Sequence, residues 1–202
     1  MEIIRAFVAV ELDPSLLAAL RRLQAKFRRD PLSQIGRWVA PEGIHLTLKF
    51  LGDVEALRVQ EIAGAVAAGC SGFGPFNISL SDPGFFPNAR SLRVIWVGVG
   101  GDVEKLTGMQ RAIESELSRI GFPAEKRGFQ PHLTLARIRD QATSYEREQM
   151  ARLVGGMRAD PSASMLVSQV SLIRSELRSS GAVYTLLAAT PLPRAEPRQG
   201  ER

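Results

Sequence analysis

The tetrapeptide His-Leu-Thr-Leu occurs twice in this chain, at residues 45–48 and again at residues 132–135. Its two histidines, His45 and His132, are the only histidines among the 202 residues. Each copy lies in apolar surroundings rich in residues that favour β-strands. A distinctive motif repeated at this distance indicates a duplicated strand-containing unit, and this duplication restricts the fold more than any other feature of the sequence.

Side chains in a strand alternate between two faces, so positions i and i+2 share a face. In each copy, the histidine and the threonine therefore point one way, and the two leucines point the other way into a core. His45 is presented beside Thr47, and His132 is presented beside Thr134. If the two units pack about a pseudo-twofold axis, both imidazoles and both hydroxyls converge on one cleft.

The order of the expected elements favours an α+β fold. Residues 6–50 and residues 93–136 share the order strand, helix, histidine strand, and no clear linker separates the two halves. We therefore expect one bilobed domain over residues 1–190 and a mobile C-terminal tail over residues 191–202, which is rich in Pro, Arg and Glu. Besides the histidine strands we expect, in chain order, a strand 5–12, a helix after Asp13-Pro14, a short strand 37–40, a helix capped by Asp53, a strand 76–80, a loop 81–90, a strand 92–99, helices 102–120 and 144–153, and paired strands 165–174 and 183–189 joined across Ser179-Ser180-Gly181.

The composition is that of a soluble globular protein, with 45% hydrophobic and 23% charged residues. The net charge is +5 and the sequence pI is about 10, which is consistent with a polyanionic partner such as RNA. Arginine is the main source of this charge, but the arginines are scattered along the chain. A general arginine bias without functional content therefore explains the charge equally well.

Cysteine usage and hydropathy favour a cytoplasmic location. Cys70 is the only cysteine, so the chain has no internal disulfide, which fits a reducing compartment. No apolar run approaches the roughly 18 residues that span a bilayer, and residues 1–12 alternate like a strand instead of forming a signal peptide. Cys70 lies in a turn-like Gly-Cys-Ser-Gly sequence far from either histidine in the chain, so we do not expect it to be a nucleophile.

Two imidazoles facing one cleft suggest paired acid and base catalysis. An unperturbed histidine has a pKa near 6.5, so one ring can be neutral while the other is protonated. The neutral ring takes a proton from water and the protonated ring gives one to the leaving oxygen. The hydroxyls of Thr47 and Thr134 can donate to the non-bridging oxygens of a phosphate, although threonine is also an ordinary strand former. This arrangement suits in-line attack on a phosphodiester.

Other chemistries have little support in the sequence. No Cys, Asp or Glu lies at ligand spacing from either histidine, so we expect no metal. No serine lies in a nucleophile elbow. Gly98 and Gly100 precede Val103 where a dinucleotide fingerprint needs a third glycine, so this segment is interpreted as a strand–turn–helix connection.

The segments Ile44–Gly52 and Phe129–Arg137, which contain the two motifs, resemble the paired motifs of the 2H phosphoesterase superfamily. Within it, the chain resembles the bacterial and archaeal RNA 2′,3′-cyclic phosphodiesterases, first described as 2′–5′ RNA ligases. The resemblance extends over nearly the whole chain except the tail. It includes the strings at residues 5–9, 38–39, 172–177 and 183–184.

The resemblance implies two pseudo-twofold-related lobes, each with an antiparallel sheet and helices, and an active site in the cleft between them. It implies hydrolysis of RNA 2′,3′-cyclic phosphate ends to 2′-phosphomonoesters without metal, ATP or other cofactor. His45 is then the proton donor and His132 the proton acceptor, although the near-symmetry of the two motifs leaves the reverse assignment open. We expect a monomer with RNA as its partner and no membrane association.

The resemblance also adds Arg137 as a phosphate contact and Phe50 as a base-stacking residue. Each lies five positions after its histidine, so strict alternation turns both toward the core. They reach the cleft only if each strand bulges or ends near that residue. Trp38 is a further stacking candidate, with a core position as the alternative.

Two alternative functions remain open from sequence alone. One is an RNA end-binding or repair factor that carries out reversible 2′–5′ ligation. The other is a phosphodiesterase that acts on a small cyclic nucleotide. The identity of the product and the relative turnover of oligonucleotide and mononucleotide substrates distinguish these functions from the first.

Overall fold

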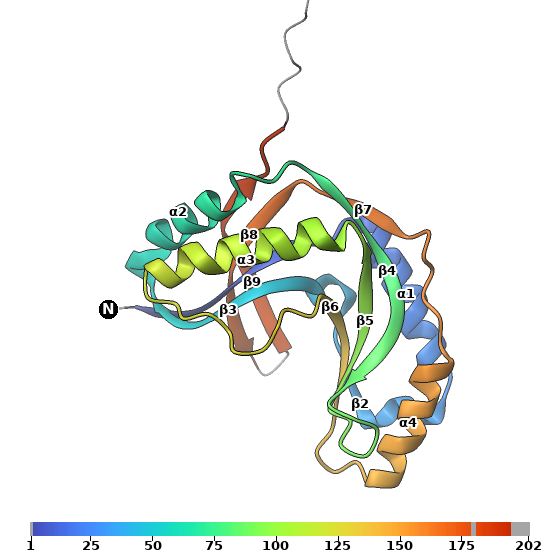
Figure 1. Cartoon of the computed structure of the whole chain (residues 1–202). Coiled ribbons are helices and arrows are strands. Elements are labelled where there is room, and N and C mark those ends of the chain that lie inside the picture. Colours follow the sequence, from blue (N-terminus) through green and yellow to red (C-terminus); the bar gives the residue numbers. More distant parts are fainter. Residues whose placement is uncertain (1, 179–180, 195–202) are drawn as a thin grey trace, which may run out of the picture.

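The computed structural model describes residues 2–178 and 181–194 (Figure 1). Within these residues, nine strands form two antiparallel sheets, and four α-helices and three short 3-10 helices complete the fold. The strands are β1 (Ile3–Glu11), β2 (Gly36–Trp38), β3 (His45–Glu55), β4 (Phe76–Phe86), β5 (Val94–Gly101), β6 (His132–Ile138), β7 (Ser164–Val167), β8 (Gln169–Arg178) and β9 (Gly181–Pro191). The helices are α1 (Pro14–Phe27), α2 (Val59–Cys70), α3 (Val103–Arg119), α4 (Ser144–Gly156), η1 (Pro31–Ile35), η2 (Pro41–Gly43) and η3 (Ala56–Arg58).

Each sheet contains one histidine strand. The first sheet has the order β3-β1-β8-β9, and the second has the order β2-β6-β5-β4-β7. In each sheet the histidine strand pairs antiparallel with the strand that opens its own repeat, β3 with β1 and β6 with β5. The expected α+β fold with two antiparallel sheets, one for each copy of the motif, is therefore confirmed.

The helices of the two repeats are exchanged between the sheets. Helix α1 connects β1 to β3 of the first sheet but packs on the second, where the ring of Phe27 lies 5.4 Å from that of Trp38 on β2. Helix α3 connects β5 to β6 of the second sheet but contacts β3 of the first, beside α2 (Figure 1). A single large hydrophobic cluster accordingly joins residues of both sheets and all four α-helices.

The helix starts follow from local sequence. The Asp13 carboxylate accepts a hydrogen bond from the Leu16 amide at 2.8 Å, and Pro14 occupies the first helical position of α1. Thr143 and Glu146 form a reciprocal capping box at the start of α4. These capping contacts confirm that α1 and α4 begin where the sequence predicted.

Two expected boundaries around β3 and β4 were wrong. Asp53 does not cap a helix, because β3 continues past Gly52 to Glu55 and Asp53 pairs with Arg5 of β1. Gly52 has φ +73°, a conformation that glycine adopts without strain, so the chain bends here without leaving the sheet. Residues 81–90 are not a loop throughout, since β4 continues to Phe86 beyond an irregularity in its pairing.

The expected strand at residues 165–174 is two strands in different sheets. Strand β7 pairs with β4 of the second sheet, whereas β8 pairs with β1 and β9 of the first. The pairing of β8 with β9 was predicted, and residues 179–180 of the predicted turn lie outside the described residues.

Residues 191 and 192, which the sequence assigned to a mobile tail, are part of the folded domain. Strand β9 includes Pro191, and the buried Leu192 donates its amide hydrogen to the Ser168 carbonyl at 2.8 Å. Residues 195–202 of the expected tail lie outside the described residues.

Candidate active site

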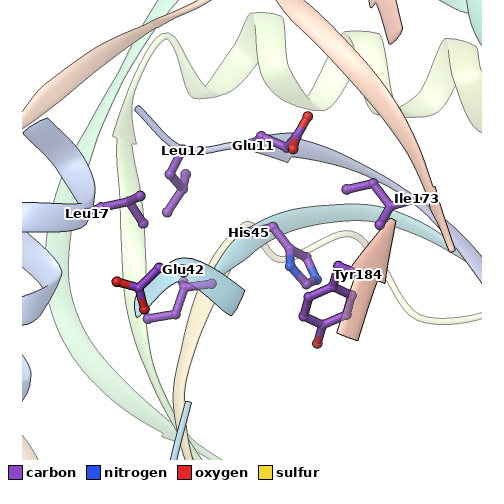
Figure 2. A pocket seen from close by; sticks show the side chains of 8 residues that line it. Glu11, Leu12, Leu17, Glu42, His45, Ile173 and Tyr184 are labelled. Carbon is purple, nitrogen blue, oxygen red and sulfur yellow. The ribbon is translucent and has the colours of Figure 1, made fainter. Parts of the chain in front are cut away.

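His45 lies at the start of β3 in an aromatic environment. Its ring stacks on Phe7, with centroids 4.5 Å apart. It also packs in a T-shaped arrangement with the Tyr184 ring, with centroids 5.0 Å apart (Figure 2). Burial lowers the pKa of His45 to about 4, while a hydrogen bond to the Gly43 backbone and the charge of Glu11 act in the opposite direction. The His45 imidazole is therefore neutral at neutral pH in this structure.

His132 lies at the start of β6. Its Nδ1 atom is 2.7 Å from the Gln130 carbonyl oxygen. A carbonyl only accepts hydrogen bonds, so this contact assigns the proton to Nδ1 and leaves Nε2 as the free acceptor. The His132 ring packs in T-shaped arrangements with Phe86, at a centroid separation of 5.3 Å, and with Trp96, at 6.3 Å. Both histidines are thus held against aromatic rings, but by different sets of residues.

Strand β3 contains a bulge at the last leucine of its motif. Lys49 pairs with Val8 and Thr47 pairs with Ala9, so Leu48 between them has no partner on β1. This extra residue changes the alternation beyond Thr47. His45, Thr47 and Phe50 consequently lie opposite Glu11, Ala9 and Phe7, which are alternate residues of one strand and share one face.

Strand β6 contains the equivalent bulge. Ala136 pairs with Ile95 and Thr134 pairs with Trp96, so Leu135 has no partner on β5. His132, Thr134 and Arg137 consequently lie opposite Gly98, Trp96 and Val94, again alternate residues on one face. The sequence required a bulge near Phe50 and near Arg137 for these residues to share a face with the histidines. Both strands contain such a bulge. The Phe50 side chain is 60% exposed, and Arg137 is also exposed.

The two histidine strands belong to different sheets but meet in the fold. Strands β3 and β6 are in contact. Burial raises the pKa of the Tyr184 phenol, and the positive charge of Arg137 opposes this shift. Arg137 of the second sheet is therefore within electrostatic reach of Tyr184 of the first, and Tyr184 contacts His45. Imidazoles, hydroxyls and a guanidinium group are groups that can bind a phosphate and move protons on either side of it when they face one cleft.

Trp38 is not brought to this cleft. Its indole N–H donates to the Ser33 carbonyl at 2.9 Å, and its ring packs on Phe27. Trp38 pairs with Ala136 of β6, whereas its neighbour Arg37 pairs with Arg137. Arg37, not Trp38, therefore shares a face with Arg137.

Two residues beside His45 were not among the predicted site residues. Tyr184 comes from β9 and Glu11 comes from the end of β1, and neither belongs to the repeated motif. With Glu42 they line a pocket of about 110 Å³ on one side of the His45 ring (Figure 2). The only sequence signal for Glu11 is its position at the end of the first strand, which antiparallel pairing brings opposite His45.

The remaining polar groups give no second reactive centre. Cys70 is buried, and burial raises the pKa of its thiol to about 11. Within the described residues, no three His, Cys, Asp or Glu side chains are grouped so as to hold a metal ion.

Among the helices of the described residues, none is both long and apolar enough to cross a membrane.

The fold and the paired His-x-Thr strands define the class: an α+β protein of the two-histidine phosphoesterase type. The model of the 2′-5′ RNA ligase superfamily matches residues 12–178. The chain therefore belongs to the 2′-5′ RNA ligase superfamily.

Individual relatives agree with this membership. An RNA 2′,3′-cyclic phosphodiesterase of Methanothermobacter thermautotrophicus is 38% identical over 182 residues, 90% of this chain and 95% of that protein. One from Aquifex aeolicus is 30% identical over 188 residues, 93% of this chain and 96% of that protein. The crystal structure of E. coli LigT in apo form superposes with a TM-score of 0.75 at 26% identity, and its complex with 3′-AMP with a TM-score of 0.76 at 27% identity. Each covers 96% of this chain and 100% of the LigT chain.

Proposed function

We propose that this protein hydrolyses the 2′,3′-cyclic phosphodiester ends of RNA to 2′-phosphomonoesters. The observation that carries the proposal is the pairing register of the two strands. His45 and Thr47 share one face of β3, and His132, Thr134 and Arg137 share one face of β6. Relatives at 38% and 30% identity, matched over almost their whole length, are named for this activity.

In the proposed mechanism His132 accepts a proton from water at Nε2, because its Nδ1 proton is engaged with Gln130. The water oxygen forms a bond to phosphorus, and the bond from phosphorus to the 3′ oxygen breaks. His45 gives its proton to that departing oxygen, so the phosphate remains on the 2′ oxygen. Thr47, Thr134 and Arg137 bind the non-bridging oxygens, where negative charge increases in the transition state.

His45 takes up its proton from solvent as the substrate binds. Burial lowers the pKa of His45 to about 4. A phosphate anion placed beside the ring favours its charged form and raises that pKa. The enzyme therefore acquires its general acid as it binds the anion. The mechanism includes no metal-dependent step.

A second candidate function is transfer of the cyclic phosphate to the 5′-hydroxyl of another RNA end, which joins the ends through a 2′–5′ bond. The description of the matching family model as a 2′-5′ RNA ligase superfamily favours it. The same groups serve both reactions, because the 5′-hydroxyl takes the place of the attacking water and the bond from phosphorus to the 3′ oxygen breaks in each. Hydrolysis remains the main proposal because the curated relatives at 38% and 30% identity carry that name.

We also propose a cytoplasmic monomer. The single cysteine is buried and unpaired, which suits a reducing compartment. Light scattering on the purified protein tests the oligomeric state.

The test of the proposed function is product analysis. Purified protein is incubated with an oligoribonucleotide that ends in a 2′,3′-cyclic phosphate, in the presence of a chelator. Phosphorus NMR then identifies the product. A 2′-phosphomonoester is expected at an undiminished rate. A 3′-phosphate product, or activity abolished by the chelator, would contradict the proposal, and joined 2′–5′ RNA would favour the alternative.

A further inference from the structure

Two glutamines are buried at equivalent places in the two repeats. Among the described residues, only four polar or charged side chains are buried, and Gln24 and Gln110 are two of them, at 3% and 4% exposure. Gln24 lies on α1 and Gln110 lies on α3. Each helix belongs to one repeat and packs on the sheet that contains the histidine strand of the other.

Gln24 binds the bulge of β6. Its Nε2 atom donates to the Leu135 carbonyl at 3.2 Å and to the Val39 carbonyl at 2.9 Å. The Val39 amide donates to the same Leu135 carbonyl at 2.9 Å. Gln24 therefore uses both amide hydrogens on backbone carbonyls, one of them belonging to the residue that has no partner on β5.

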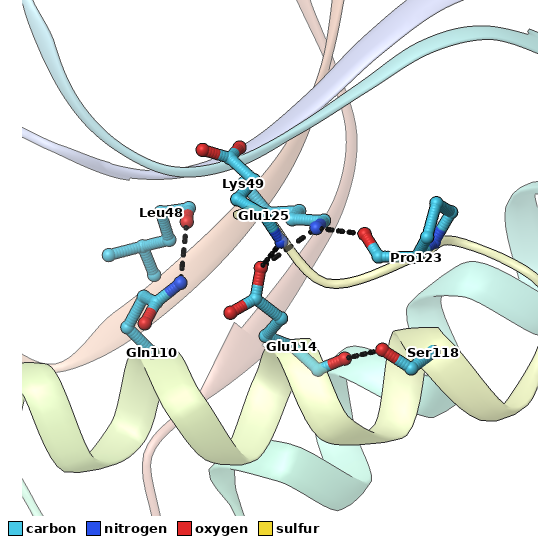
Figure 3. Close-up of polar contacts among 7 residues, drawn as sticks. All are labelled: Leu48, Lys49, Gln110, Glu114, Ser118, Pro123 and Glu125. Atoms are coloured by element: carbon cyan, nitrogen blue, oxygen red, sulfur yellow. Dashed lines mark hydrogen bonds and ion pairs between the residues drawn. The ribbon is translucent and has the colours of Figure 1, made fainter. Parts of the chain in front are cut away.

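Gln110 binds the bulge of β3 in the same way. Its Nε2 atom donates to the Leu48 carbonyl at 3.3 Å (Figure 3). On the same helix, Glu114 accepts a hydrogen bond from Lys49 Nζ at 2.8 Å. The bulged residue and the residue after it are thus both connected to α3.

We propose that Gln24 and Gln110 are positioning residues that stabilise the two bulges and so determine which side chains face the cleft. Each glutamine donates a hydrogen bond to the carbonyl of the bulged residue, and at β6 it does so beside the Val39 amide, so both glutamines help to hold the bulged backbone in place. A strand that loses its bulge shifts its alternation by one residue. Arg137 would then turn away from His132, and Phe50 would turn away from His45.

The exchanged helices make each effect specific. Gln24, from the first repeat, acts on Arg137 of the second, and Gln110, from the second repeat, acts on Phe50 of the first. A role confined to general stability would not distinguish Arg137 from Phe50. This inference rests on the proposed function for its activity readout.

The test is a pair of double-mutant cycles on cyclic-phosphate RNA. Gln24→Met keeps the side-chain volume and removes both donors. We expect it to lower kcat/KM about tenfold in the wild-type and Phe50→Ala backgrounds, and less than about twofold when Arg137→Ala is present. Gln110→Met should lower kcat/KM in the wild-type and Arg137→Ala backgrounds and have little effect on it when Phe50→Ala is present. Gln60→Met, at an exposed position of α2, is the matched control and should leave kcat/KM within about twofold.

Equal effects of Gln24→Met with and without Arg137 would overturn the inference, as would no effect at all. If Gln24→Met does not fold, Gln24→Asn keeps the amide but is too short to reach Leu135, and it enters the same cycle. Inorganic phosphate binding gives a second readout, which Gln24→Met should weaken and Gln110→Met should not. If this binding pattern appears without turnover of cyclic phosphate, the proposed function fails and the positioning role stands. If the protein turns over cyclic phosphate but the effects of the paired substitutions simply add, the positioning role fails and the proposed function stands.

Discussion

The environments of the two histidines differ although their motifs are identical. His45 stacks on Phe7 and meets Tyr184, and burial there lowers its pKa to about 4. Opposite it on the neighbouring strand lies Glu11, whereas the residue opposite His132 is Gly98. The duplication therefore supplies two imidazoles, and the residues outside the motif make them chemically distinct.

The titration of His45 should be directly observable. Because the chain has only two histidines, proton NMR of their ring signals separates them after a His132→Gln assignment. We expect a His45 midpoint near pH 4 in the empty protein and a higher midpoint when a nucleoside 2′-phosphate is bound. Tyr184→Ala should also raise it, since water then reaches the ring. A midpoint near 6.5 in the wild type would contradict the buried, aromatic setting.

The same shift makes folding stability depend on pH. The folded state binds the His45 proton less readily than the unfolded chain, whose histidine pKa is near 6.5. The contribution of this group to stability is therefore complete above pH 6.5 and is lost as the pH falls from 6.5 to about 4. Urea unfolding across this range should show that loss in the wild type and a smaller one in His45→Asn. If the free energy of unfolding fell equally with pH in both proteins, His45 would not be the source of the loss.

The repeated motif predicted the pairing of histidine with threonine because strand alternation depends only on local sequence. Arg137 and Phe50 were harder to place, since their orientation depends on one unpaired residue in each strand. Those bulges are stabilised by glutamines on distant helices. Tyr184 lies in a string that the family resemblance includes, but nothing in the sequence placed it beside His45, which it reaches only through the pairing of β8 with β9.

At the scale of elements, the start of α1 was predictable and the end of β3 was not. Asp13-Pro14 is a local signal that acts through one hydrogen bond. The extension of β3 to Glu55 depends instead on its pairing with β1, which overrides the capping preference of Asp53. The run 165–174 looks like one strand in sequence, but its two halves pair in different sheets.

The buried ion pair between β3 and α3 should be a strong element-level contact. The Lys49 side chain is 3% exposed, and its Nζ donates to Glu114 at 2.8 Å and to the Pro123 carbonyl at 2.6 Å (Figure 3). Lys49→Met leaves Glu114 without its cation and should lower the free energy of unfolding by about 3 kcal/mol. Arg119→Met, which removes an exposed pair with Glu116, is the control and should cost about 0.5 kcal/mol or less. Equal small losses in urea unfolding would show that the pair contributes little.

At the scale of the whole molecule, the exchange of helices predicts that neither lobe folds alone. Helices α1 and α3 each leave their own sheet and contribute to the core of the other. The two tryptophans, Trp38 and Trp96, both lie in the second sheet. Tryptophan fluorescence should therefore follow that lobe while far-ultraviolet circular dichroism follows both. We expect the two signals to give one coincident urea transition, and two separate midpoints would contradict the interlocked core.

The central claim is that His45 and His132 act together on one phosphodiester. Its most direct test is turnover of cyclic-phosphate RNA by His45→Ala, His132→Ala and the double variant. Each single variant should lose a factor of about 10²–10⁴ in kcat, and the double variant should lose little more, because residues that act as a unit are not additive. A single variant with near wild-type turnover, or losses that multiply in the double variant, would contradict the account.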